Sequence, residues 1–351
     1  MPVNLFTVPR MTLAQIARRT GFSRSTVSYA LRNDPKIPSE TRERIQAAAR
    51  ALGYRPNPRV AELLAQIRRG RRHPVGERLA FVWVHTARRE AAESAFLQGV
   101  LTGARERAQQ SGYALEEFWT DDPGMTDRRL QQVIRARGIT GVILSPVMHA
   151  ETTVTLDWDW SQFAAAVVGN VTWQPELHHA GHHHFVGMQI CLRELARHGY
   201  RRPAAVIDAE TNERAKRAWQ GAFAAHHPTP SAIPALWRLH HGSRDLPLSW
   251  LTRGNADALI VSGTELLAGN ALHAHCGKRG LPVLSLRWEE ETLPVGGIDP
   301  CYPRIAAHAV DLVANQLTLN ESGPPDLPRI MLFAGRWIAP PEFAGRARVP
   351  A

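Results

Sequence analysis

The stretch 12–31 constrains the chain most, because its pattern is that of two short helices joined by a tight turn. Thr12 and Gln15 form a capping box at the start of the first helix. Gly21 ends that helix, since glycine enters a left-handed turn without steric cost. Ser23 is the expected cap of the second helix. Apolar residues recur at helical spacing at positions Leu13, Ile16, Ala17, Val27, Ala30 and Leu31.

Between its apolar positions, the second helix carries hydrogen-bonding side chains of a size that reaches base edges and phosphates in a major groove. These side chains are Arg24, Ser25, Thr26, Ser28 and Tyr29. The pattern predicts a helix-turn-helix whose second helix reads DNA. Taken alone, it also fits three helices of an unrelated α-helical domain. A third helix is expected over 39–52, with Ser39 as its cap and Gly53 as its end.

The charge of the chain is unevenly distributed. Residues 1–75 hold 15 Lys and Arg against 4 Asp and Glu, a net charge of +11, whereas the other 276 residues hold 27 against 28, a net charge of −1. This asymmetry predicts a polyanionic partner for the N-terminal part, with a merely solvated basic face as the alternative. The arginines expected to contact phosphate are Arg18, Arg19, Arg32, Arg42, Arg55 and Arg59.

From residue 79 onward, short apolar strands alternate with helical patterns. The runs LAFVWVH (79–85) and TGVILSP (140–146) are typical of strands buried on both faces. The alternation predicts two similar α/β units with parallel sheets. The run RIMLFAGRWI (329–338) is interpreted as one final strand. In such folds a ligand binds at the carboxyl ends of the strands.

The segments TLAQIARRTGFSRSTVSYALRN and ETRERIQAAARALGYRPN, with the hinge that follows them, closely resemble the LacI/GalR family of bacterial transcription regulators. More loosely, the resemblance extends over nearly the whole chain. It implies a multidomain fold, in which a small all-α helix-turn-helix headpiece precedes a two-lobed α/β domain like the periplasmic sugar-binding proteins. It also implies a homodimeric repressor, a palindromic double-stranded DNA operator and a small, sugar-like effector between the lobes.

The resemblance divides the chain into five parts. A disordered arm is expected at 1–10, a headpiece at 11–55, a hinge helix with linker at 56–75, the two-lobed effector-binding and dimerisation domain at 76–338, and a tail at 339–351. Crossings between lobes are expected near Asn170, Glu290 and Pro328. Lobe one would then comprise about 79–170 and 291–328, and lobe two about 171–290 and the C-terminal strand.

The resemblance also assigns roles in DNA binding. Arg24, Ser25 and Tyr29 align with the base-contacting positions of the family. Leu63 aligns with the hinge leucine that wedges into the minor groove, although Val60 replaces the alanine that the family usually has three positions earlier. The expected backbone contacts are Thr12, Ser23, Thr26, Ser28, Arg32, Arg55 and Asn57.

Several polar groups with which the family holds its effectors are replaced. Ala218 stands where an arginine is usual, and His183 stands where an acidic residue is usual, whereas Asp299 matches the family. Tryptophans near the ends of expected strands could stack on a sugar ring, although a tryptophan in an α/β domain more often lies in the core. The expected effector-binding residues are His85, Trp173, His183, Arg217, Thr264, Trp288 and Asp299.

Five histidines lie close together in LHHAGHHHFVG, at positions 178, 179, 182, 183 and 184. Imidazoles at this density can bind zinc or nickel. No nearby cysteine or carboxylate completes a ligand set, so a surface or cleft-lining cluster at the start of a helix is expected, with no metal and no cofactor.

Other function classes are less favoured. The sequence has neither a glycine-rich phosphate loop nor a G-x-S-x-G motif, so an enzyme is not expected. Three scattered cysteines fit reduced thiols in a cytoplasm, and no run of 18 apolar residues predicts a membrane span. Two alternatives stay open: a DNA-binding regulator whose degenerate sensor binds no effector, and a sugar-binding or metal-dependent enzyme with an appended headpiece.

Overall fold

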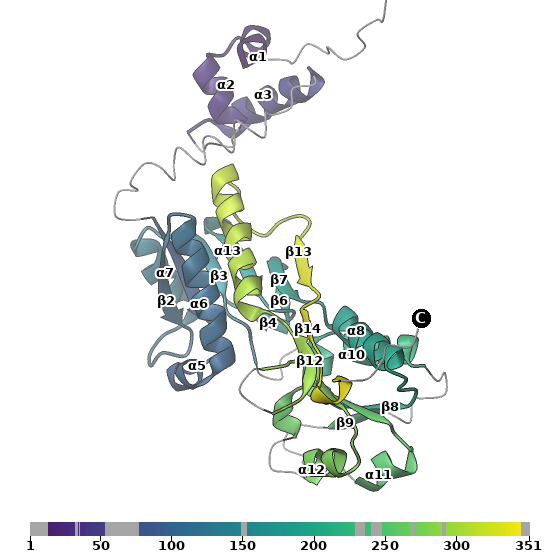
Figure 1. Cartoon of the computed structure of the whole chain (residues 1–351). Coiled ribbons are helices and arrows are strands. Elements are labelled where there is room, and N and C mark those ends of the chain that lie inside the picture. Colours follow the sequence, from purple (N-terminus) through teal and green to yellow (C-terminus); the bar gives the residue numbers. More distant parts are fainter. Residues whose placement is uncertain are drawn as a thin grey trace, which may run out of the picture.

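The computed structural model describes residues 13–31, 34, 36–52, 77–148, 153–228, 236–239, 248–267, 271–289 and 293–344. They form a group of three helices and two α/β lobes (Figure 1). The predicted arm and the predicted hinge lie outside the described residues. So do six of the expected DNA contacts, Thr12, Arg32, Arg55, Asn57, Arg59 and Leu63.

The N-terminal helices are α1 (Leu13–Thr20), α2 (Arg24–Ala30) and α3 (Ser39–Ala51). Ile16, Val27 and Ile45, one from each helix, are completely buried against one another. The Ser23 hydroxyl accepts a hydrogen bond from the Thr26 backbone N–H at 3.0 Å, so the predicted cap of α2 is confirmed. The predicted cap of α3 is wrong, because Pro38 occupies the cap position and Ser39 is already helical.

The first lobe is built on a six-stranded sheet in the order β13-β7-β5-β3-β1-β2, with every pair parallel. Its strands are β1 (Arg78–Trp83), β2 (Ala114–Trp119), β3 (Gly141–Leu144), β5 (Ala164–Val168), β7 (His178–His182) and β13 (Ile330–Phe333). Its helices are α5 (Arg88–Glu93), α6 (Ala95–Gln110), α7 (Asp127–Ala136) and α13 (Tyr302–Leu319). Helices α6 and α13 pack together on one face of the sheet, and α7 covers the other.

A small parallel pair, β4 (Thr153–Thr155) with β6 (Thr172–Gln174), and the short helix η1 (Trp160–Gln162) complete the first lobe.

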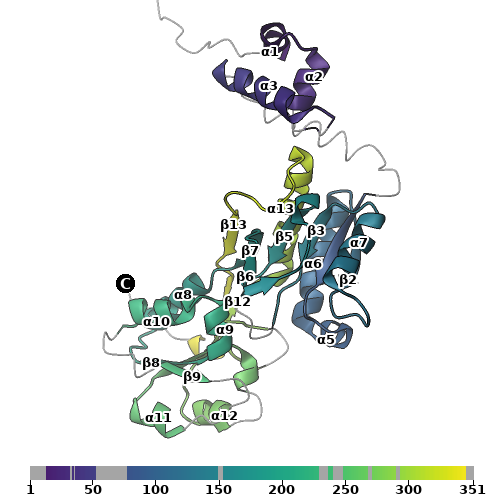
Figure 2. The same ribbon diagram turned by 180° about the vertical axis from the view of Figure 1, so that it is seen from behind.

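The second lobe repeats this plan with the sheet order β14-β12-β11-β10-β8-β9. Its strands are β8 (Pro203–Asp208), β9 (Leu236–Leu239), β10 (Ala258–Val261), β11 (Val283–Ser285), β12 (Gly296–Asp299) and β14 (Arg336–Ile338), the last antiparallel to β12. Its helices are α8 (His184–Arg197), α9 (Ala209–Arg214), α10 (Ala218–His226), α11 (Leu248–Arg253) and α12 (Ala271–Lys278), with short turns η3 (Thr264–Leu266) and η4 (Pro341–Phe343). Figure 2 shows the two lobes from behind.

The chain passes between the lobes three times, each time later than predicted. It crosses from β7 to α8, from β12 to α13 and from β13 to β14. The run 329–338 is therefore two strands in two sheets rather than one. Gly335 lies between them with a φ of +78°, and a Cβ there would lie 2.6 Å from the Ile298 side chain and 2.7 Å from the Asp299 carbonyl oxygen.

Two further details correct the sequence analysis. Residues 178–182 form the strand β7 rather than the start of a helix. The predicted tail is partly folded, because Phe343 is buried and stacks on His198 with ring centroids 3.8 Å apart. None of the described helices is long and apolar enough to cross a membrane.

Candidate functional site

The outer surface of α2 holds the residues predicted to read bases. Arg24 and Ser25 are exposed, and the side chain of Tyr29 is 40% exposed. Val27 and Ala30, on the opposite side of the helix, are fully buried in the helical core. The seven-residue helix α2 therefore presents a polar, partly basic face to solvent.

The residues predicted to contact the DNA backbone lie beside this face where they are described. The hydroxyls of Ser23 and Thr26 are hydrogen bonded to each other at 2.8 Å, and Ser28 is half-buried. Arg18 and Arg19 are exposed in the last turn of α1. A hydroxyl pair at a helix N-terminus is well suited to a phosphate, because the first N–H groups of the helix point in the same direction.

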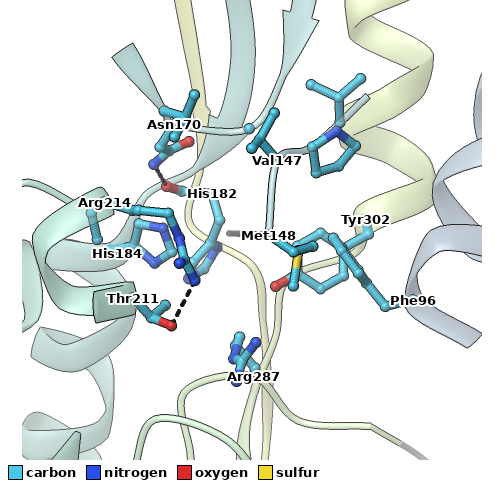
Figure 3. Close-up of a pocket in the computed structure, with 15 residues that line it drawn as sticks. Phe96, Val147, Met148, Asn170, His182, His184, Thr211, Arg214, Arg287 and Tyr302 are labelled. Atoms are coloured by element: carbon cyan, nitrogen blue, oxygen red, sulfur yellow. Dashed lines mark hydrogen bonds between the residues drawn. The ribbon is translucent and has the colours of Figure 1, made fainter. Parts of the chain in front are cut away.

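A cavity lies between the two lobes, where the carboxyl ends of their parallel strands meet (Figure 3). Residues that follow β3, β5, β8 and β11 contribute to its lining. The lining residues named in Figure 3 are Phe96, Val147, Met148, Asn170, His182, His184, Thr211, Arg214, Arg287 and Tyr302.

The second lobe supplies two arginines to this cavity. Arg287 donates from Nε to the Ser262 carbonyl oxygen at 3.1 Å and forms an ion pair with Glu265. Although burial opposes it, the attraction of carboxylates, chiefly that of Glu265, holds the pKa of Arg287 above its ordinary value. Arg214 donates to the Thr211 hydroxyl at 2.9 Å. Burial lowers the pKa of Arg214, and the positive charge of Arg287 acts in the same direction.

Two histidines lie at the crossing from β7 to α8. The rings of His182 and His184 meet edge to face with centroids 5.0 Å apart, and His184 meets Trp219 in the same way at 4.8 Å. His182 is only 3% exposed, and burial lowers its pKa to about 4. Burial also lowers the pKa of His184 well below its ordinary value. Both imidazoles are therefore neutral at pH 7.

The first lobe supplies an apolar wall. Phe96 and Tyr302 meet edge to face with centroids 4.3 Å apart, and Met148 lies beside them (Figure 3). Asn170 has a structural role, because its Nδ2 donates to the His182 carbonyl oxygen at 2.7 Å. A Cβ at Gly181 would lie 1.6 Å from the Asn170 Oδ1, so only glycine fits next to this contact.

None of the seven residues predicted to bind an effector lies among the residues that line this cavity. Three of them make other contacts near strand ends. His85 has a φ of +48° and places its Nδ1 3.6 Å from the Asp121 carboxylate. His183 caps α8 by accepting from the Val186 N–H at 3.4 Å. Asp299 accepts from the Cys301 N–H at 2.7 Å and pairs with Arg336 at 2.8 Å.

The other four predicted residues also lie outside the lining of the cavity. Trp173 is 4% exposed and belongs to the core of the first lobe, which contradicts a position in the cavity. Arg217 pairs with Glu213 on the surface at 2.9 Å. Thr264 is buried at the start of η3. Trp288 donates to the Val295 carbonyl oxygen at 2.9 Å.

The sequence did not indicate the two arginines or the aromatic pair as cavity residues, whereas His182 and His184 belong to the run that was expected on the surface or lining the cleft. The sequence positions of both arginines could have indicated a place in the cavity. Arg287 follows the end of β11 by two residues, and Arg214 lies on α9, the helix after β8. For the histidine run, no group of three or more His, Cys, Asp or Glu side chains in the described residues could hold a metal ion.

The sequence model of bacterial regulatory proteins of the lacI family matches residues 12–57, which include the three N-terminal helices. The match shows that the N-terminal segment 12–57 is similar to lacI-family regulatory proteins. The HTH-type transcriptional regulator PtxS of Pseudomonas plecoglossicida is 30% identical over 141 residues, which cover 40% of this chain and 37% of that protein. AglR of Rhizobium meliloti is 46% identical over 65 residues, 18% of this chain and 16% of that protein. The chain thus matches well under half the length of these relatives.

Two solved structures share the architecture of both lobes. A complex of the transcriptional regulator CelR with cellobiose has a TM-score of 0.51 and 15% identity, over 92% of this chain and 97% of that one. A LacI-family regulator from Rhizobium etli has a TM-score of 0.55 and 12% identity, over 77% of this chain and 99% of that one. The predicted fold, a helix-turn-helix headpiece followed by a two-lobed α/β domain with parallel sheets, is confirmed.

Proposed function

We propose that this chain is a sequence-specific DNA-binding transcription regulator, a homodimeric repressor whose affinity for a palindromic operator changes when a small ligand binds between its lobes. The observation that carries the proposal is the solvent-facing surface of α2. There Arg24, Ser25 and Tyr29 project from a helix whose other side is fully buried. The family match over 12–57 covers the same helix.

Arg24 is the residue best suited to direct readout. A guanidinium can donate two parallel hydrogen bonds to O6 and N7 of guanine, the commonest specific contact in a major groove. Ser25 and Tyr29 offer hydroxyls to neighbouring base edges. The described residues Ser23, Thr26 and Ser28, with Thr12, Arg32, Arg55 and Asn57, would hold the backbone and set the register.

The regulation follows from linkage between two sites. A ligand in the interlobe cavity favours one arrangement of the lobes, and operator DNA favours one arrangement of the hinges. Each then changes the affinity for the other by the same factor. The cavity supports this interpretation against a degenerate sensor, because Arg214, Arg287 and Tyr302 still converge on it.

Arg24→Ala tests the proposal. An operator would first be selected from random duplexes with the full chain, and binding would then be measured by fluorescence anisotropy on it and on single-base variants. Loss of a bidentate hydrogen-bonded pair should cost about 1–3 kcal/mol on the selected site and relax preference at one base pair. The matched control is Arg89→Ala, which removes an exposed arginine of α5 and should leave binding unchanged. An equal loss on every duplex would assign Arg24 to phosphate, and selection without any sequence preference would overturn the proposed function.

A further inference from the structure

The polar side chains that line the interlobe cavity are rich in hydrogen-bond donors. Of the described residues that line it, two are arginines and two are histidines, and none is an aspartate or a glutamate. An arginine has only donors, and a neutral imidazole has one donor and one acceptor. The one amide in the lining, Asn170, already donates to the His182 carbonyl oxygen. The cavity therefore fits a ligand that is rich in acceptors.

The two guanidinium groups also concentrate positive charge. Arg214 comes from α9 and Arg287 from the segment after β11, and both side chains project toward the open space facing Met148 and Tyr302 (Figure 3). The charge of Arg287 disfavours the charged form of Arg214, so the two groups are close enough to repel. A ligand with a negative group between them would relieve this repulsion, whereas a neutral ligand would leave it in place.

The surrounding carboxylates do not remove this charge from the cavity. Glu265 pairs with Arg287, but its side chain is 57% exposed and it does not line the cavity. Glu289 also lies outside the lining, and burial raises its pKa, which disfavours its charged form. Asp208 acts on both arginines from the end of β8, again outside the lining. These carboxylates attract the arginines from outside the lining of the cavity.

We infer that the effector is a small anion whose carboxylate or phosphate group lies between Arg214 and Arg287, with its carbon skeleton against Phe96, Met148 and Tyr302. Charge-assisted hydrogen bonds from a guanidinium to an oxyanion are about twice as strong as neutral ones, and they fix the orientation of the ligand. The neutral imidazole of His184 can donate one further hydrogen bond. The inference rests on the proposed function, and it specifies the small, sugar-like effector as an anion.

The test uses three ligands with one ring: D-glucose, D-glucuronate and D-glucose 6-phosphate, together with inorganic phosphate. Thermal melts of the full chain would be recorded with each ligand at 10 mM, on the order of a weak effector's dissociation constant, and at constant ionic strength. The anionic probes should raise the melting temperature and glucose should not. A shift with both phosphates alone identifies a phosphate effector, and a shift with glucuronate alone identifies a carboxylate. An equal shift with glucose, or no shift with any anion, overturns the inference.

Substitutions of the two arginines test whether the anion binds at Arg214 and Arg287. Arg214→Gln and Arg287→Gln should each weaken the binding of the active probe at least tenfold, as measured by calorimetry. Arg253→Gln, which removes an exposed arginine of α11, should leave it unchanged. Arg287 also holds the Ser262 carbonyl oxygen, so Arg214→Gln decides the result if Arg287→Gln does not fold. Anion binding that persists in Arg214→Gln contradicts the site.

DNA binding is measured on the same preparations, so the two hypotheses can fail separately. Intact operator binding with no response to anions refutes the anionic effector and leaves the regulator. Anion binding without sequence-specific DNA binding refutes the regulator and leaves the anion site.

Discussion

His182 illustrates how the burial of one residue sets a pH dependence. Its imidazole has a pKa of about 4 in the folded chain, below the ordinary value of 6.5, because burial disfavours the charged form. As the pH falls, the unfolded chain takes up the proton first, so stability is complete above about pH 7.5 and is lost progressively as the pH falls toward 4. Between pH 7.5 and 5 this residue alone should cost about 2 kcal/mol of unfolding free energy.

Urea denaturation at the two pH values measures this loss. In His182→Gln the difference between pH 7.5 and pH 5 should shrink by about 2 kcal/mol. His226→Gln, at an exposed position on α10, should keep the wild-type difference. An unchanged pH dependence in His182→Gln would show that other groups carry it, of which the nearest is His184, whose pKa is shifted in the same direction.

At the residue scale, the sequence predicted which side of α2 is exposed better than it predicted the lining of the cavity. Helical periodicity separates Arg24, Ser25 and Tyr29, which are exposed, from Val27 and Ala30, which are buried. In the sensor the predictions fell on neighbours of the lining residues: His183 instead of His182 and His184, and Trp288 instead of Arg287. At a strand end the direction of a side chain depends on the local turn, and periodicity does not determine it.

At the element scale, β7 is a strand that the sequence did not reveal. Its residues HHAGH are largely polar and resemble a surface segment. They form a strand because parallel neighbours β5 and β13 lie on both sides of it, and because the Arg329 N–H donates to the His178 imidazole at 2.8 Å. Since the crossing follows this strand, missing it placed the boundary between the lobes too early. The apolar strands β1, β3 and β5, by contrast, were predictable from composition alone.

The predicted hinge helix would connect the DNA-binding headpiece to the two-lobed sensor, so the two sites would influence each other through it. Residues 57–67 are fewer than the roughly 12–15 that an isolated helix needs in water, so we expect this segment to fold only on DNA. Leu63 should then wedge into the minor groove with its dimer mate and kink the central base step. Leu63→Ala is expected to weaken operator binding and reduce the bend, with the thermal stability of the sensor unchanged.

A gel-shift bend assay beside a thermal melt distinguishes the outcomes for the hinge. If Leu63→Ala leaves the bend intact and Leu64→Ala abolishes it, the register of the hinge is displaced by one residue. If neither substitution changes the bend, the hinge does not act as the family resemblance implies.

At the scale of the whole molecule, charge is divided between two tasks. Residues 1–75 carry a net charge of +11 and the remainder a net charge of −1. Attraction to a polyanion is therefore expected mainly at the N-terminal part, whereas the two arginines that line the interlobe cavity, Arg214 and Arg287, belong to the nearly neutral remainder. A small anion and the DNA do not compete for the same groups, so any effect of one on the other must pass through the arrangement of lobes and hinges.

This division predicts a steep salt dependence for DNA binding. If the headpieces of a dimer neutralise about 6–10 phosphates, operator affinity should fall by about 10³–10⁵ between 50 and 200 mM salt, because each neutralised phosphate releases a condensed cation. Anisotropy titrations at several KCl concentrations give the slope. Arg18→Ala, at an exposed position of α1, should reduce that slope by about one for each phosphate that the arginine neutralises, with little change in sequence preference. A nearly flat dependence would mean that the positive charge of residues 1–75 does not contact the DNA backbone.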